Sequence, residues 1–317
     1  MHHAPCTIPL APCPLHPSNS KLLNSQPSKL PHSPRGIMYT TLITTEELAA
    51  NLDDPQWVVV DCRFRLDDPD EGRRLYEAAH IKGALYADLD RDLAGPATPN
   101  EGRHPLPDLD DFRRTLGGWG IDEGVQLVCY DDWGGALAAR LWWMVRYLGH
   151  RAVAVLDGGW PAWQAAALPT ASGAEQRDAT IFCGDPDPQR LATMHEVEAL
   201  VQRGDGQRLI DARDAARYRG DFEPIDPAAG HIPGARNYPF SENIAATGHF
   251  KADEALAAQF QTLLADLPSD EAIVYCGSGV TATHNLLAMA HAGLPEARLF
   301  VPSWSGWSSD PSRPVER

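Results

Sequence analysis

Short apolar runs alternate with longer amphipathic or apolar patterns along most of the chain. The short runs predict buried strands, and the longer patterns predict helices. The predicted strands are Val58–Asp61, Leu127–Tyr130, Val153–Leu156 and Arg298–Val301; the predicted helices are Ala136–Leu148 and Ala282–His291, closed by Gly149 and Gly293. Because strands and helices alternate, the pattern predicts an α/β fold in which helices flank a mainly parallel sheet.

This pattern occurs twice. Residues 58–63 (VVVDCR) match 208–213 (RLIDAR), and 80–84 (HIKGA) match 231–235 (HIPGA). Tyr130-Asp131 matches Tyr275-Cys276, and residues 160–163 (WPAW) match 304–307 (WSGW). Four matches in the same order at nearly constant spacing indicate a tandem duplication. We predict a first domain over residues 38–172, a Pro- and Gly-containing linker over 173–190, and a second domain over 191–317.

The first 37 residues differ from the rest of the 317-residue chain. They contain eight prolines, and the first carboxylate is Glu46. We expect residues 1–37 to be a disordered tail, or translation to begin at Met38. Thr44 or Thr45 then caps the first helix. The tail lacks the apolar segment of a secretory signal.

Composition excludes several classes of function. Lys and Arg number 27 against 43 Asp and Glu, a formal charge of −16, which disfavours binding to nucleic acid. No apolar run approaches the length of a membrane span. The six cysteines form no CxxC pair and no cluster with zinc-ligand spacing, so we expect no metal site and a reducing, cytoplasmic setting.

The candidate chemistry lies in one turn from a strand to a helix, Ile273-Val274-Tyr275-Cys276-Gly277-Ser278-Gly279-Val280-Thr281-Ala282. Cys276 ends the strand, and Gly277 and Gly279 allow a tight loop whose N–H groups point inward. Together with the positive end of the next helix, such a loop stabilises a thiolate. Ser278 and Thr281 add hydroxyl groups.

The duplication helps to decide whether Cys276 is reactive or merely a buried cysteine. The first copy has Asp131 at this position. Since a core position would not readily accept both residues, we expect the position to be a loop tip, with one copy active and the other not. Cys62 and Cys129 fall within strand patterns and are expected to fill the core.

On these motifs, residues 40–310 resemble the two-domain rhodanese family of thiosulfate and 3-mercaptopyruvate sulfurtransferases. The resemblance implies that the first domain is catalytically silent, with Asp131 in place of the cysteine. It implies that the Cys276 thiolate takes a sulfane sulfur from a donor and passes it, as a persulfide, to cyanide or a thiol. No metal or organic cofactor is required.

The resemblance also assigns roles to individual residues. It implies catalytic roles for Cys276, Ser278 and Asp90, and places the site between the domains. The residues implied in substrate binding are Arg217, Gly277, Gly279, Val280, Thr281 and His104. The loop sequence resembles that of mercaptopyruvate enzymes, because residues 277–281 carry no positive charge. However, residues 223–230 lack the second arginine of those enzymes, which leaves thiosulfate as the alternative donor.

The sequence also bears on three other classes of function: a phosphatase, a binding module and a persulfide carrier. A Cys-x5-Arg phosphatase needs an arginine where this chain has Ala282, which disfavours phosphoryl transfer. A non-catalytic binding module and a persulfide carrier that delivers sulfur to a protein partner stay open. The acceptor is a thiol or cyanide, with a thioredoxin-like protein among the candidates.

Overall fold

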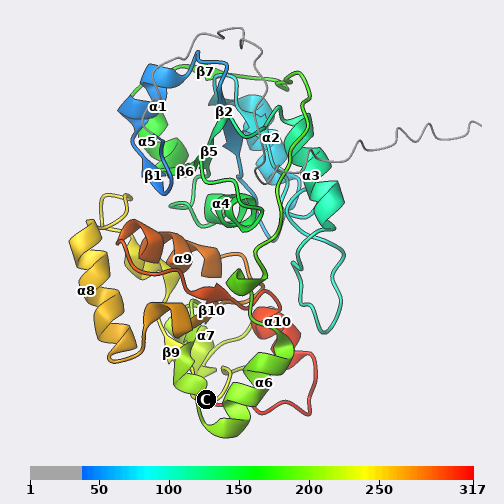
Figure 1. Ribbon diagram of the computed structural model, residues 1–317, viewed down its shortest axis with the longest axis vertical. Coiled ribbons are helices and arrows are strands. Elements are labelled where there is room, and N and C mark those ends of the chain that lie inside the picture. The colour runs from blue at the N-terminus through cyan, green and yellow to red at the C-terminus, as the bar shows by residue number, and fades with distance from the viewer. Residues whose placement is uncertain (1–37) are drawn as a thin grey trace, which may run out of the picture. The chain divides into compact units, whose positions relative to one another are not determined.

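Two parallel sheets form the centre of the computed structural model, which describes residues 38–317 (Figure 1). The expected tail, residues 1–37, lies outside the described residues. In the first sheet the strand order is β1-β6-β5-β2-β4, and in the second it is β11-β10-β8-β9. All neighbouring strands in both sheets run parallel. The predicted α/β fold with mainly parallel sheets is therefore confirmed.

The two sheets share one topology, as the repeats in the sequence predict. The strands of the first are β1 (Leu42–Ile43), β2 (Trp57–Asp61), β4 (Leu85–Tyr86), β5 (Gln126–Tyr130) and β6 (Val153–Leu156). Those of the second are β8 (Leu209–Asp211), β9 (Arg236–Asn237), β10 (Ile273–Tyr275) and β11 (Arg298–Leu299). A parallel bridge between Leu191 and Leu299 stands in the place of the β1–β6 pairing. Separately, β3 (His80–Ile81) pairs antiparallel with β7 (Thr170–Ala171).

Helices connect the strands. In the first half they are α1 (Thr45–Asn51), α2 (Glu71–Ala78), α3 (Leu109–Gly118), α4 (Ala138–Tyr147) and α5 (Gly159–Ala165). In the second half they are α6 (Met194–Arg203), α7 (Ala215–Arg219), α8 (Asp253–Leu264), α9 (Ala282–His291) and α10 (Ser303–Ser308). Short 3₁₀ turns lie at Pro188–Arg190, Gly206–Arg208, Phe240–Asn243 and Ser269–Glu271. Thr44 caps α1 through a capping box with Glu47.

Helices α4 and α9 contact each other and join the two halves. Nine of the ten residues of α4 are buried, and so are eight of the ten residues of α9. A helix that is buried on nearly all sides belongs to the core rather than to the surface. One hydrophobic cluster accordingly contains buried residues of both halves, Trp142 and Leu287 among them, and each half has a further cluster of its own.

The repeated Asp-x-Arg segments have the same structural role in each half. Arg63 pairs with Asp61 and lies 4.7 Å from the ring centroid of Trp160. Arg213 pairs with Asp211 and lies 4.7 Å from the ring centroid of Trp304. All four charged side chains are almost fully buried, so each carboxylate compensates a guanidinium that also stacks on tryptophan.

Candidate active site

Cys276 lies between the end of β10 and the start of α9, and its residue is only 1% exposed. Its N–H donates to Oγ of Ser303 (3.2 Å), and its carbonyl accepts from the N–H of Trp304 (2.9 Å). The carbonyl of Gly277 accepts from the N–H of Ser305 (2.9 Å). Helix α10 therefore fixes the backbone of the Cys276 loop, residues 276–281.

Gly279 permits the tight turn of this loop. Its φ is +76°, in the left-handed region where a side chain is strained. A Cβ on Gly279 would also lie 2.5 Å from the carbonyl oxygen of Val301, which is too close for any side chain. Val280 is buried in the core, and Thr281 precedes the first residue of α9.

The equivalent loop of the first half, residues 131–136, shows what the turn can bind. Asp131 and Cys276 both lie in the loop after their strand, as expected, but both are buried, so the argument that a buried position would not accept both residues was wrong. The Asp131 carboxylate accepts four backbone N–H bonds of 2.7–2.8 Å, donated by Trp133, Gly135, Leu137 and Ala138. Burial raises the pKa of Asp131, and these N–H groups oppose the shift. The four N–H groups of the turn thus form an anion-binding site, which is called the N–H cradle below.

In the Cys276 loop the cradle holds no carboxylate. The corresponding N–H groups belong to Ser278, Val280, Ala282 and Thr283, and the last donates to the carbonyl of Val280 (3.1 Å). Within residues 38–317, no carboxylate accepts a hydrogen bond from this loop. The cysteine of the second half therefore occupies the place where the first half carries its own anion.

Ser278, His104 and Asp90 form a chain of polar side chains next to Cys276. Oγ of Ser278 lies 2.7 Å from Nδ1 of His104, and Nε2 of His104 lies 3.3 Å from Oδ1 of Asp90. Burial, together with the positive charges of Arg140 and Arg103, lowers the pKa of His104 to about 3. A neutral ring that donates from Nε2 to Asp90 accepts the Ser278 hydroxyl at Nδ1. The structure therefore brings the two residues of the first half, predicted from resemblance, to the Cys276 loop.

Arg140 is a buried cation that the sequence analysis missed. It lies in α4, and its Nη1 donates to the carbonyl of Gly279 (3.0 Å). Its Nη2 donates to the carbonyls of Leu93 and His104 (3.2 and 3.1 Å). Burial lowers the pKa of Arg140 to about 10, and the charge of Cys276 acts in the opposite direction. The available signal in the sequence was an arginine in the first turn of α4, followed directly by five apolar residues, 141–145.

Arg217 lies near the Cys276 loop: its Nη1 is 3.5 Å from a Cβ built on Gly277, whereas its Nε and Nη2 bond to carboxylates. It pairs with Glu223 (2.7 Å) and Asp226 (3.1 Å). Arg103, which the sequence analysis also missed, pairs with the other carboxylate oxygen of Asp226. The two arginines therefore share a buried carboxylate beside the loop. Arg213 bonds to Asp211 (2.6 Å) and also to Glu223 (3.3 Å), so its role is structural.

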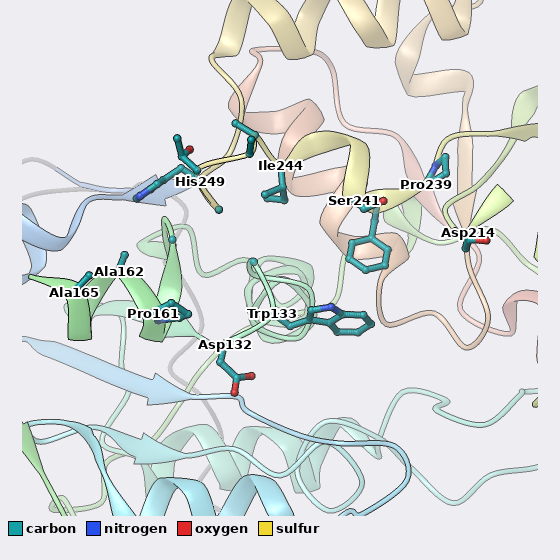
Figure 2. A pocket seen from close by; sticks show the side chains of 17 residues that line it. Asp132, Trp133, Pro161, Ala162, Ala165, Asp214, Pro239, Ser241, Ile244 and His249 are labelled. Atoms are coloured by element: carbon teal, nitrogen blue, oxygen red, sulfur yellow. The ribbon is translucent and has the colours of Figure 1, made fainter. Parts of the chain in front are cut away.

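A cavity of about 840 Å³ borders the loop of Asp131 rather than that of Cys276 (Figure 2). Trp133 lines it from the first half, and Ser241, Ile244 and His249 line it from the second. Trp133 occupies the position of Ser278 in the repeat, and its ring packs edge to face on Phe240 at 5.2 Å. This cavity is the counterpart of the Cys276 site and lacks the nucleophile.

Within residues 38–317, no three His, Cys, Asp or Glu side chains are grouped so that they could hold a metal ion. None of the described helices has both the length and the apolar character needed to cross a membrane. The groups at the Cys276 loop are a thiol, a hydroxyl, an imidazole, guanidinium groups and backbone N–H groups.

Comparison with known proteins places this geometry in a family. The model of the rhodanese-like domain matches residues 44–166 and 193–310. The chain is 47% identical over 276 residues to a probable 3-mercaptopyruvate sulfurtransferase of Pseudomonas aeruginosa, covering 86% of this chain and 97% of the relative. It is 40% identical over 291 residues to the putative thiosulfate sulfurtransferase SseB of Mycobacterium tuberculosis, covering 87% and 96%.

Solved structures agree with the sequence comparison. The crystal structure of SseA from Escherichia coli, a 3-mercaptopyruvate sulfotransferase, superposes with a TM-score of 0.73 at 31% identity. The match covers 84% of this chain and 99% of that one. With two matched domains, one cysteine loop and relatives that span the same length, the chain belongs to the rhodanese-like family and is a sulfurtransferase.

Proposed function

We propose that the chain transfers sulfur from 3-mercaptopyruvate to cyanide or a thiol through a persulfide on Cys276. The Cys276 thiolate attacks the donor sulfur, so that an S–S bond forms as the C–S bond breaks. The electron pair of the C–S bond passes to the carbon of the leaving enolate, and a proton added at that carbon gives pyruvate. Cyanide then attacks the terminal sulfur, leaves as thiocyanate and restores the thiolate.

The observation that carries this proposal is the carboxylate of Asp131 in the first half. Its oxygens are two bonds beyond Cβ, as the terminal sulfur of a cysteine persulfide is. Four N–H groups bind those oxygens. The matching N–H groups of Ser278, Val280 and Ala282 would thus face the terminal sulfur and stabilise its negative charge, whereas that of Thr283 bonds to the carbonyl of Val280. Arg140, which touches the same loop at Gly279, adds a buried positive charge.

Ser278, His104 and Asp90 are positioned to move the proton. Nδ1 of His104 holds the Ser278 hydroxyl, and the Asp90 carboxylate beside Nε2 stabilises the imidazolium that forms when a proton passes to the ring. The same proton can return to the enolate. We propose that this chain of groups deprotonates the thiol in the first step and protonates the product in the second. Arg217 would bind the carboxylate of the donor.

The direct test is Cys276→Ser, compared with Cys129→Ser as a control at a buried cysteine away from the loop. The Cys276→Ser protein should form no persulfide with mercaptopyruvate and no thiocyanate with cyanide, while its circular dichroism spectrum is unchanged. The Cys129→Ser protein should keep both reactions per folded molecule. Thiocyanate production by Cys276→Ser would overturn the assignment of the nucleophile.

Thiosulfate is the second candidate donor, because the chain is also similar to the putative thiosulfate sulfurtransferase SseB. Side-by-side kcat/KM values with cyanide as the common acceptor decide between the donors. We expect a preference for mercaptopyruvate, since residues 277–281 carry no cation for a dianion. A preference for thiosulfate would reverse the assignment.

The natural acceptor is proposed to be the thiol of a thioredoxin-like protein in the cytoplasm. Pyruvate release from mercaptopyruvate with reduced thioredoxin, compared with a small thiol at equal concentration, tests this acceptor. No stimulation by thioredoxin above the small thiol would remove it.

A further inference from the structure

Arg103 places a second cation beside the residue that follows the nucleophile. A methyl group built on Gly277 would lie 3.1 Å from Nη2 of Arg103 and 3.5 Å from Nη1 of Arg217. Two guanidinium groups, one from each half of the chain, therefore border the same small space next to Cys276. The segment 223–230, which carries no arginine, does not supply this second cation; the first half does.

Both the backbone and the guanidinium group of Arg103 are held in place by polar contacts. Its backbone N–H donates to Oγ of Ser305 (3.1 Å), and its guanidinium pairs with Asp226, whose side chain is 2% exposed. The other oxygen of Asp226 accepts from Arg217 (3.1 Å). A buried carboxylate thus holds both guanidinium groups toward the loop.

The two arginines differ in the donors that they still offer. Arg217 gives Nε and Nη2 to Glu223, and Nη2 also to Asp226. Arg103 gives Nη1 to Asp226, whereas its Nε is buried without a hydrogen-bond partner. Buried N–H donors without a partner are rare in native proteins and are often completed by a ligand. Arg103 is therefore better placed than Arg217 to bind an incoming anion.

The charges around the loop explain why a second arginine is needed. Arg217 and Arg103 carry two positive charges, and Glu223 and Asp226 carry two negative charges. This cluster is neutral as it stands, so Arg217 alone, facing two carboxylates, attracts a donor anion weakly. A bidentate contact from Arg103 supplies directional binding that charge alone does not.

We propose that Arg103 binds the carboxylate of the sulfur donor and makes the site selective for donors that carry one. This inference rests on the proposed function, because it assumes that Cys276 accepts sulfur from the bound donor. It assigns donor recognition to a residue of the first half, which carries no nucleophile. Asp226 acts as a positioning residue for both arginines.

Mercaptopyruvate and mercaptoacetone, which has a methyl group in place of the carboxylate, form the test pair. In Arg103→Ala, kcat/KM for mercaptopyruvate should fall about 10- to 100-fold, the usual value of a charged bidentate contact. The value for mercaptoacetone should fall much less, so the ratio between donors collapses. Arg103→Lys should restore part of the ratio, and Arg114→Ala, an exposed arginine of α3, serves as the control for net charge.

A binding measurement separates this inference from the proposed function. Titration of mercaptopyruvate into Cys276→Ser by calorimetry should give a Kd that rises about 10-fold or more when Arg103→Ala is added. Equal losses for both donors, an unchanged Kd, or no binding of mercaptopyruvate to Cys276→Ser would each overturn the role of Arg103. Failure of the proposed function would instead appear as a wild-type protein that binds mercaptopyruvate and forms no persulfide.

Discussion

The loops at Asp131 and Cys276 have the same backbone arrangement, but the first contains a carboxylate and the second contains a thiol. Each follows a central strand, turns at a glycine of positive φ (Gly134 or Gly279) and enters a buried helix. The first is filled by its own carboxylate, which uses the N–H groups permanently. The second leaves its cradle to a cysteine. The same kind of loop can therefore stabilise the fold, when the anion is one of its own side chains, or support a reaction, when the anion arrives with the substrate.

Each loop is also held by the other half of the chain. The carbonyl of Gly279 accepts from Arg140 in α4, and the carbonyl of Gly134 accepts from Nε2 of His284 in α9 (2.9 Å). The donor at the Cys276 loop is the permanently charged guanidinium of Arg140, whereas the donor at the Asp131 loop is the titratable imidazole of His284. The Cys276 loop is thus held by a donor that stays protonated over the whole physiological pH range.

The largest effect is expected when Cys276 is replaced by aspartate, the residue that the first loop carries at this position. Cys276→Asp should lower kcat/KM at least about 10³-fold, because the nucleophile is gone. Its unfolding free energy should exceed that of Cys276→Ser, because the carboxylate fills the N–H cradle as Asp131 does. Thiocyanate assays and urea unfolding measure the two effects. A Cys276→Asp protein less stable than Cys276→Ser would contradict the equivalence of the cradles.

Removal of the Asp131 carboxylate from the first loop also tests whether the two loops are equivalent. Asp131→Ala leaves four buried N–H groups without their acceptor, so the unfolding free energy should fall by about 3–5 kcal/mol. Asp131→Asn, which keeps one acceptor oxygen, should lose less. Denaturant unfolding gives both values. A loss below about 1 kcal/mol in Asp131→Ala would show that the cradle binds its anion weakly.

The two loop glycines form a matched pair. Alanine at Gly279 meets the Val301 carbonyl oxygen at 2.5 Å, whereas alanine at Gly134 first meets a side-chain carbon of Ile244 at 3.4 Å. We expect Gly279→Ala to lose about 2–4 kcal/mol and most of its activity. Gly134→Ala should lose only the cost of its positive φ, about 1–2 kcal/mol. Equal losses would mean that backbone strain alone governs both turns.

The smallest effect concerns pH. Burial lowers the pKa of His284 to about 4, and that of the unfolded chain is near 6.5. Below pH 6.5 the unfolded state binds a proton that the folded state does not, so stability falls as the pH drops toward 4. Between pH 7 and pH 5 His284 should account for about 2 kcal/mol of this loss. His284→Gln should flatten the pH dependence by that amount; an unchanged slope in urea unfolding would contradict it.

The sequence predicted the core strands well because β2, β5 and β6 are apolar runs whose burial leaves few alternatives. It predicted the Cys276 loop because glycines and a strand end mark such turns. It missed Arg103 and Arg140, since no pattern within one copy tells which side chains of the other copy reach its loop. It also misjudged Asp131, because backbone N–H groups that make burial of a carboxylate tolerable leave no trace in a one-dimensional pattern.

The packing of α4 on α9 limits how the duplicated chain can evolve. The first copy no longer has a nucleophile, yet its α4 fills the shared core and carries Arg140. Selection can therefore relax at the Asp131 loop while it remains strict on the helix behind it. Without the first copy, the face of α9 that packs on α4 would be exposed to water, so the inactive copy acts as an obligatory internal subunit.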